Sequence, residues 1–164
     1  MASSALGLYP GARASPQRVQ TSGGSMNADS TRVGGGPFPT EKNNNIGDYI
    51  RERGNEYGTT TRRPRRCGWF DAVVVRYATR VNGLTGLAVT KLDVLDTLDT
   101  LAICTGYRAG DEVLSEFPAD ILALERLEPV YDGFDGWERS IAYARRLGGL
   151  PGKARSPLAR THVR

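Results

Sequence analysis

A short helix with a marked start and stop, followed at once by a strand, is the segment of this sequence that most restricts its fold. The apolar residues after Phe70 recur at helical spacing, as Val73, Val74, Tyr77, Ala78 and Val81. Asp71 is placed to cap the first amides of this helix, and Asn82-Gly83 is a natural C-terminal stop. Residues 84–89 have the apolar character of a buried strand. A helix joined this closely to a strand favours the α/β class.

The rest of the chain continues this alternation. We expect a helix or turn over residues 46–53, ended by Gly54, a strand over 101–108 and a short strand near Val113. A late helix is expected over residues 138–147, ending before Gly148-Gly149 and Pro151. The 164 residues are enough for one domain, but the convincing strands are few, so the sequence predicts an incomplete core.

A dense basic loop precedes the helix. Residues 59–66 place three threonine hydroxyls and four arginines in eight positions: Thr59, Thr60, Thr61, Arg62, Arg63, Pro64, Arg65 and Arg66. Arginine forks suit carboxylate and phosphate oxygens, and a helix N-terminus also favours negative charge. We therefore expect an anion-binding loop at the start of the helix. A solvated basic run is the alternative.

A second polar group, Thr90-Lys91-Leu92-Asp93, follows the strand over 84–89. A carboxylate at a strand end can accept two hydrogen bonds from guanine, which adenine cannot offer, and a lysine stem can lie along the base. The pattern is compatible with a guanine-selective site. The alternative is that these residues form a surface turn with no binding role.

Taken together, these residues closely resemble the adenylosuccinate synthetase family in order and spacing. The resemblance is carried by residues 31–41 (TRVGGGPFPTE), 53–61 (RGNEYGTTT), 65–71 (RRCGWFD) and 90–96 (TKLDVLD), then by 103–107, Gly136-Trp137 and Leu150-Pro151. It runs from about Thr31 to about Ala154 and is not seen outside these limits. It implies a partial, mainly parallel sheet with flanking helices, belonging to the C-terminal portion of a larger fold.

The family joins inosine monophosphate (IMP) to aspartate, using GTP to phosphorylate the purine 6-oxygen. The resemblance implies that Thr59, Thr60, Thr61, Arg62, Arg63, Pro64 and Arg65 form the loop that receives aspartate. It implies that Arg63 and Val33 contact IMP, and that Arg65, Lys91, Leu92 and Asp93 contact GTP. It further implies Mg²⁺ with GTP, a cytoplasmic ligase of AMP biosynthesis, and a homodimer in the full-length family.

The chain departs from the family pattern in two ways. Arg62 stands where the family loop has glycine, which puts a bulky residue at a position suited to positive φ. The family's Gly-Asp-Glu-Gly-Lys-Gly-Lys phosphate loop and its catalytic aspartate and histidine have no counterpart here, and the only histidine is His162. We assign no catalytic residue and no metal ligand, and expect no turnover by this chain alone. The alternative function is a noncatalytic anion- or nucleotide-binding remnant or interaction module.

The two ends differ from the central part. Residues 1–30 are rich in Ser, Ala, Gly and Arg, and residues 155–164 are basic, so both are expected to be disordered around a partial domain of residues 31–154. A transit peptide is the alternative for the first segment. No apolar run suits a membrane span or a signal peptide. The net charge of +4 and the basic tail would attract nucleic acid only nonspecifically, since no zinc spacing or helix-turn-helix pattern occurs.

The two cysteines, Cys67 and Cys104, are too few for a disulfide framework, and they indicate a reduced, cytoplasmic protein. Cys104 is expected in the core. Cys67 is flanked by arginines, from which we expect a lowered thiol pKa, but no base accompanies it.

Overall fold

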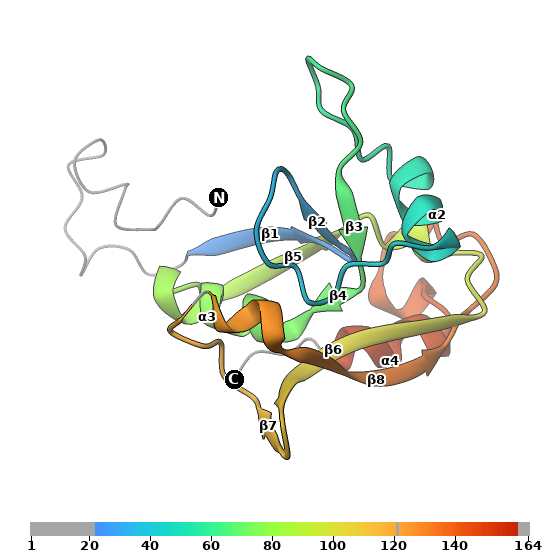
Figure 1. Cartoon of the computed structure of the whole chain (residues 1–164). Helices are drawn as coiled ribbons and strands as arrows, with labels where there is room; N and C mark the ends of the chain where they lie inside the picture. Colours follow the sequence, from blue (N-terminus) through green and yellow to red (C-terminus); the bar gives the residue numbers. More distant parts are fainter. Residues whose placement is uncertain (1–21, 121, 161–164) are drawn as a thin grey trace, which may run out of the picture.

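A computed structural model of the chain describes residues 22–120 and 122–160. These residues form one four-stranded sheet, two two-stranded sheets and three α-helices (Figure 1). The larger sheet contains β4 (Phe70–Asp71), β6 (Thr100–Ala109), β7 (Glu112–Leu114) and β8 (Glu128–Asp135). In it β6 pairs parallel with β4 and antiparallel with β7 and β8. β6 therefore forms the centre of the larger sheet.

Two further strand pairs lie beside this sheet. β1 (Gly23–Asn27) pairs parallel with β5 (Gly86–Thr90), with Gly23 opposite Gly86 and Asn27 opposite Thr90. β2 (Ser30–Arg32) pairs antiparallel with β3 (Arg66–Gly68). The expected disorder of residues 1–30 is thus wrong for 23–27 and Ser30, because β5 and β3 supply the hydrogen-bond partners. The expectation for residues 1–21 lies outside the described residues.

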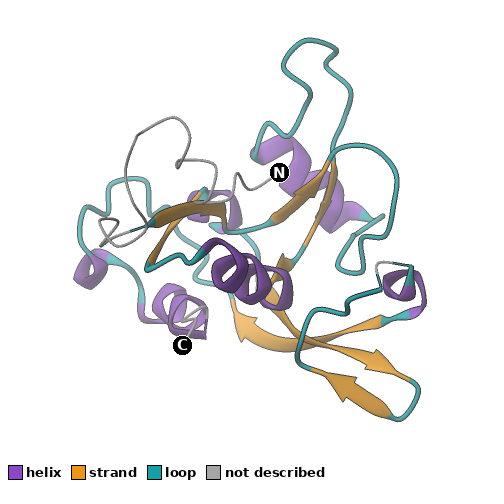
Figure 2. Cartoon of the chain, turned by 90° about the vertical axis from the view of Figure 1, so that its left-hand side faces the viewer, coloured by secondary structure: helices purple, strands orange, loops and turns teal. Residues whose placement is uncertain are grey.

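Three helices flank the strands (Figure 2): α2 (Asn45–Arg53), α3 (Ala72–Asn82) and α4 (Gly152–Arg160). The 3₁₀ helices are Leu92–Leu95, Ala123–Arg126 and Leu147–Gly149. The expectations for α2, α3, β5 and β6 are confirmed to within two residues at each end, and the short strand expected near Val113 is confirmed as β7. The α/β class is also confirmed. None of the helices in the described ranges is long and apolar enough to cross a bilayer.

The late helix was placed wrongly. Residues 138–146 form no helix; α4 instead covers Gly152–Arg160, so the expected disorder of the basic tail is wrong for residues 155–160. One cause is Asp96, whose buried carboxylate accepts hydrogen bonds from the Trp137 indole nitrogen at 2.8 Å and from the Ile141 amide at 3.1 Å. Glu138 between them adopts φ 48°, which ends any regular helix there. The basic tail is therefore helical as far as Arg160.

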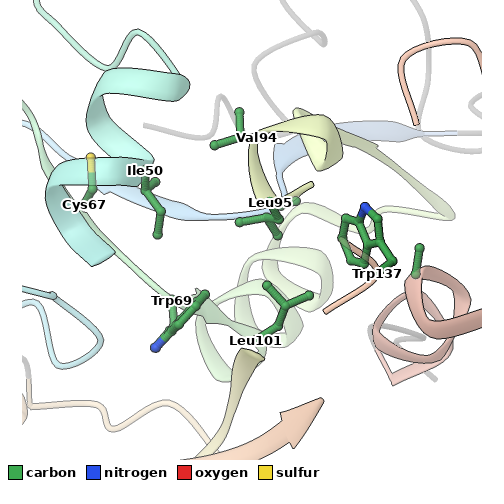
Figure 3. Close-up of a cluster of buried hydrophobic side chains, with 9 residues drawn as sticks. Ile50, Cys67, Trp69, Val94, Leu95, Leu101 and Trp137 are labelled. Carbon is green, nitrogen blue, oxygen red and sulfur yellow. The ribbon is translucent and has the colours of Figure 1, made fainter. Parts of the chain in front are cut away.

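The main core cluster joins these elements (Figure 3). Its buried members are Ala28, Ile50, Cys67, Trp69, Val94, Leu95, Leu101, Trp137 and Ala154. They come from α2, β3, β6, α4 and the 3₁₀ helix Leu92–Leu95, among other segments. The 3₁₀ helix Leu92–Leu95, which follows β5, is therefore held in place by the burial of Val94 and Leu95 in this core.

Candidate functional site

The site begins where α2 ends. Asn44 caps α2, its side chain accepting hydrogen bonds from the amides of Ile46 and Gly47, and the helix stops at Gly54. Asn55 then takes φ 50°, and the amide of the next residue, Glu56, donates to the Arg51 carbonyl at 2.8 Å. This turn places Glu56 in the interior, where its side chain is 1% exposed.

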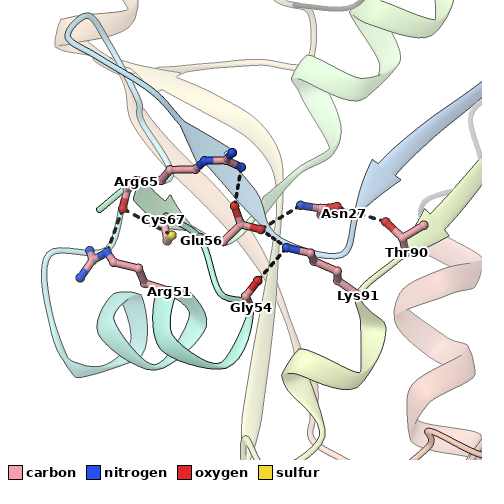
Figure 4. Close-up of polar contacts among 8 residues, drawn as sticks. All are labelled: Asn27, Arg51, Gly54, Glu56, Arg65, Cys67, Thr90 and Lys91. Carbon is pink, nitrogen blue, oxygen red and sulfur yellow. Dashed lines mark hydrogen bonds and ion pairs between the residues drawn. The ribbon is translucent and has the colours of Figure 1, made fainter. Parts of the chain in front are cut away.

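Glu56 is the centre of a polar network (Figure 4). Its Oε2 accepts a hydrogen bond from Arg65 at 2.8 Å, and its Oε1 accepts from the Lys91 ammonium and from the Asn27 amide, the latter at 3.3 Å. The Lys91 ammonium also donates to the Gly54 carbonyl at 2.7 Å. A buried carboxylate is therefore neutralised by two cations from segments far apart in sequence.

The threonine–arginine loop is a hairpin that projects from the molecule, at the top of Figure 1. Tyr57 and Pro64 pair at its base, and the Gly58 amide donates to the Arg63 carbonyl at 2.8 Å. Arg62 has φ 54°, so the position where the resembled family has glycine adopts the left-handed conformation with an arginine in place. The guanidinium groups of Arg62 and Arg63 make no hydrogen bond or ion pair within residues 22–120 and 122–160, and the residues of the tip from Thr59 to Pro64 are exposed.

The Lys91–Asp93 segment follows β5 directly. Lys91 has φ 57° and precedes the 3₁₀ helix Leu92–Leu95. Because its ammonium is held at Glu56 and Gly54, the lysine stem is fixed, while the Asp93 carboxylate is exposed. The structure therefore brings Arg65 and Lys91 together at one carboxylate, with Asp93 two residues further along the chain.

The glycine-rich turn after β2 lies next to a different cavity. Arg66 holds this turn by donating to the Gly36 carbonyl at 2.8 Å while it pairs with Glu41. A cavity of about 300 Å³ lies between the turn and α3, lined in part by Arg32, Phe38 and Val74. Val33 is 76% exposed and does not belong to the Glu56 network.

One expectation about the basic loop is wrong. The first free amides of α3, those of Val73 and Val74, already donate to the Asp71 carboxylate at 3.0 and 3.1 Å. β3 and β4 also separate the hairpin from α3. These two amides are therefore not available to an anion held by the arginines.

The cysteines are buried. Cys104 lies in the core, as expected, and burial raises the pKa of its thiol to about 12. Burial also raises the pKa of Cys67 to about 11, so the expected lowering by nearby arginines is wrong. Among the residues that the structure describes, no group of three or more His, Cys, Asp and Glu could hold a metal ion.

The comparison with protein families decides the identity. The model of the adenylosuccinate synthetase family matches residues 1–162. The chain belongs to the adenylosuccinate synthetase family. The match extends beyond residues 31–154, so the limits drawn from the motifs were too narrow.

Several curated adenylosuccinate synthetases are similar in sequence. The protein from Pelotomaculum thermopropionicum is 55% identical over 88% of this chain and 34% of its own length. That from Bacillus licheniformis is 52% identical over 94% of this chain and 36% of its own length. The chain thus spans about a third of the length of the curated relatives it matches.

A solved structure supports the same family. The fully ligated adenylosuccinate synthetase from Plasmodium falciparum superposes with a TM-score of 0.90 at 36% identity, over 96% of this chain and 38% of that one. The α/β arrangement described above is therefore that of part of the synthetase fold. Sequence reasoning missed Glu56 as a site residue, although it is the one acidic residue in the quoted stretch RGNEYGTTT.

Proposed function

We propose that this chain is the C-terminal portion of an adenylosuccinate synthetase and carries its guanine- and aspartate-binding surfaces. The proposed overall reaction is the GTP-dependent ligation of IMP to aspartate, a step of AMP biosynthesis in the cytoplasm. One observation carries the proposal: the Lys91 ammonium is tied to Glu56 and Gly54, which fixes the lysine stem, while Asp93 is open to solvent. A fixed stem and a free carboxylate are the two groups that guanine recognition needs.

The exposed hairpin supports the second part of the proposal. The tip from Thr59 to Pro64, with Arg65 at its base, would receive the aspartate substrate, because the guanidinium groups of Arg62 and Arg63 have no competing carboxylate among the described residues. Arg63 would also contact IMP, together with Val33 in the exposed turn. Arg65 would lie near GTP, alongside Lys91, Leu92 and Asp93.

Magnesium, which the family uses with GTP, does not enter the proposed role of this chain. The described residues offer no cluster of metal-ligating side chains, so no step is assigned to a metal here. A homodimer, as in the full-length family, is part of the proposal for the whole enzyme.

A second candidate function is binding without turnover. The 164 residues contain no Gly-Asp-Glu-Gly-Lys-Gly-Lys segment. Losing a single donor that stabilises the transition state typically costs on the order of a hundredfold in rate, and here several groups are lacking. We therefore expect the purified chain to bind ligands and to make no adenylosuccinate. Magnesium- and GTP-dependent product above a no-enzyme control, with contamination excluded, would contradict this.

Calorimetry with GTP and ATP tests the guanine site. GTP should bind more tightly, and Asp93→Asn should remove most of the preference, since an amide cannot accept both hydrogen bonds; a charged contact of this kind contributes roughly 1.5–3 kcal/mol. Asp99→Asn, which changes an exposed aspartate nearby, is the matched control and should leave the preference intact. Equal affinities for GTP and ATP in the unmutated chain would count against the proposal.

A further inference from the structure

The network around Glu56 joins the two surfaces proposed above. Arg65 closes the hairpin that carries Thr59 to Pro64, and Lys91 opens the segment that carries Asp93. Each contacts a different oxygen of the same carboxylate, Arg65 at Oε2 and Lys91 at Oε1. Because both cations contact the Glu56 carboxylate, a displacement of one cation would move the group that holds the other.

The carboxylate is itself well fixed. Its side chain is 1% exposed, its own amide donates to the Arg51 carbonyl, and its own carbonyl accepts from the Arg65 amide at 3.0 Å. Arg51 in turn donates to the Arg65 carbonyl at 2.8 Å. Glu56 and Arg65 are thus held by main chain and side chain together, and α2 supplies the fixed frame.

Each of the two segments that Glu56 connects, the hairpin and the segment after β5, contains a residue with a strained backbone. Lys91 has φ 57° and Arg62 has φ 54°, a conformation that is unfavourable for residues with a Cβ atom. Strain of this kind persists only where surrounding contacts enforce it, and it concentrates at ligand-binding segments. For Lys91 the enforcing contacts are visible, because its ammonium is bound at Gly54 and Glu56.

We propose that Glu56 is a positioning residue that couples the guanine-binding segment to the aspartate loop, so that a ligand at one segment orders the other. The inference rests on the proposed function, because it takes the two segments to be ligand-binding. Glu56 touches no ligand in this scheme. It acts by fixing Lys91 and Arg65 relative to each other, and coupling between two such sites must be reciprocal.

Hydrogen exchange read by mass spectrometry, on the full chain with and without GTP, tests the coupling. In the unmutated protein GTP should slow exchange in residues 90–95, which it contacts, and also in residues 58–63 of the hairpin, a range that leaves out Arg65 because Arg65 is itself a proposed GTP contact. Slowing of about fivefold or more in the hairpin is expected, at the lower end of typical coupling. Aspartate added alone should slow residues 90–95 in return.

Glu56→Gln removes one of the two contacts that hold Lys91, so it should bind GTP more weakly; at saturating GTP it should still show protection of residues 90–95, because Lys91 keeps its contact with the Gly54 carbonyl, and it should lose the protection of 58–63. Glu56→Asp keeps the charge but is too short to reach both cations, so it serves if the first variant does not fold, with the same expected result. Asp48→Asn is the control, because it removes an exposed ion pair to Arg51 at 2.6 Å and leaves the Glu56 contacts intact. The control should behave like the unmutated protein.

The outcomes separate this inference from the function on which it rests. Protection of 90–95 without any effect on 58–63 in the unmutated protein would overturn the positioning role and leave the guanine site standing. Protection of 58–63 in the Glu56 variants equal to that in the unmutated protein, at saturating GTP, would also overturn it. Absence of protection at 90–95 in the unmutated protein would overturn the guanine site itself, and the coupling with it.

Discussion

Asp29 is a single residue with an unusual electrostatic position. It is 6% exposed, and neither of its carboxylate oxygens has a hydrogen-bond partner within the described ranges. Burial, and to a smaller extent the nearby Glu56, raise the pKa of Asp29 to about 6 against the opposing effect of Lys91. The folded protein therefore holds a proton on Asp29 more tightly than the unfolded chain does.

We predict that this residue makes the protein less stable as pH rises from about 4 to about 6. The folded state binds the proton over that range and the unfolded state does not, so the free energy of unfolding falls and then stays low; against an ordinary aspartate pKa of ~3.9, the loss is roughly 3 kcal/mol. Asp29→Asn should remove this fall, as measured by urea unfolding at a series of pH values. Asp48→Asn serves as control, and an unchanged slope in Asp29→Asn would disprove the assignment.

Arg62 gives a second prediction at this scale. Its φ of 54° suits glycine, so Arg62→Gly should raise the free energy of unfolding by about 0.5–1 kcal/mol despite the greater freedom of the unfolded chain. Arg63→Gly, at a neighbouring position that is not among those with positive φ, should lower it by a similar amount. Thermal melts of the two variants should move in opposite directions. Movement in the same direction would show that the left-handed conformation carries no strain.

Among the elements, α3 shows best what the sequence could predict. Its boundaries depend on local chemistry: Asp71 caps the first amides, and Gly83 closes the helix with φ 59°. Both residues are visible in the sequence, because a cap acts on its immediate neighbours. The strands β5 and β6 were likewise marked by their own apolar runs.

The elements that the sequence did not predict depend on distant partners. β1 has the unpromising sequence GGSMN and forms because β5, about sixty residues later, supplies its hydrogen bonds. β8 contains Pro, Gly and three acidic residues, yet pairs with β6 along most of its length. The candidate site follows the same rule, since the proximity of Arg65 and Lys91 depends on Glu56, and the spacing of the motifs does not contain that contact.

The cap of α3 carries the prediction at the element scale. Asp71 also accepts a hydrogen bond from the buried Tyr107 hydroxyl at 2.6 Å, which links α3 to β6. Asp71→Ala removes the cap and leaves that hydroxyl unpaired, so the free energy of unfolding should fall by about 2–4 kcal/mol. A double-mutant cycle with Tyr107→Phe, followed by urea unfolding, isolates the link. Strictly additive losses would mean that the hydroxyl contributes nothing through Asp71.

The whole molecule leaves apolar surface uncovered. Val74, Tyr77 and Val81 lie at helical spacing on α3 and are 40%, 41% and 53% exposed. The β1–β5 pair is only two strands wide, and such a pair is marginal when it stands alone. Exposed apolar patches and short open sheets recruit other chains.

We accordingly predict concentration-dependent self-association in sedimentation velocity experiments. Val81→Lys should weaken it several-fold, because a charge in the exposed stripe of α3 must be desolvated on contact. Ala142→Lys adds the same charge at another exposed position and should have little effect. A sample that remains monomeric at high concentration would show that the exposed apolar stripe of α3 does not drive self-association.

The packing of the core has one practical consequence. The chain has two tryptophans, Trp69 and Trp137, and both are buried in the same cluster. The Trp137 indole is bonded to Asp96, at the end of the 3₁₀ helix that begins just after Lys91. Tryptophan fluorescence of this protein is therefore a spectroscopic readout of one region, the junction between the 3₁₀ helix after Lys91 and the core, and requires no added dye or label.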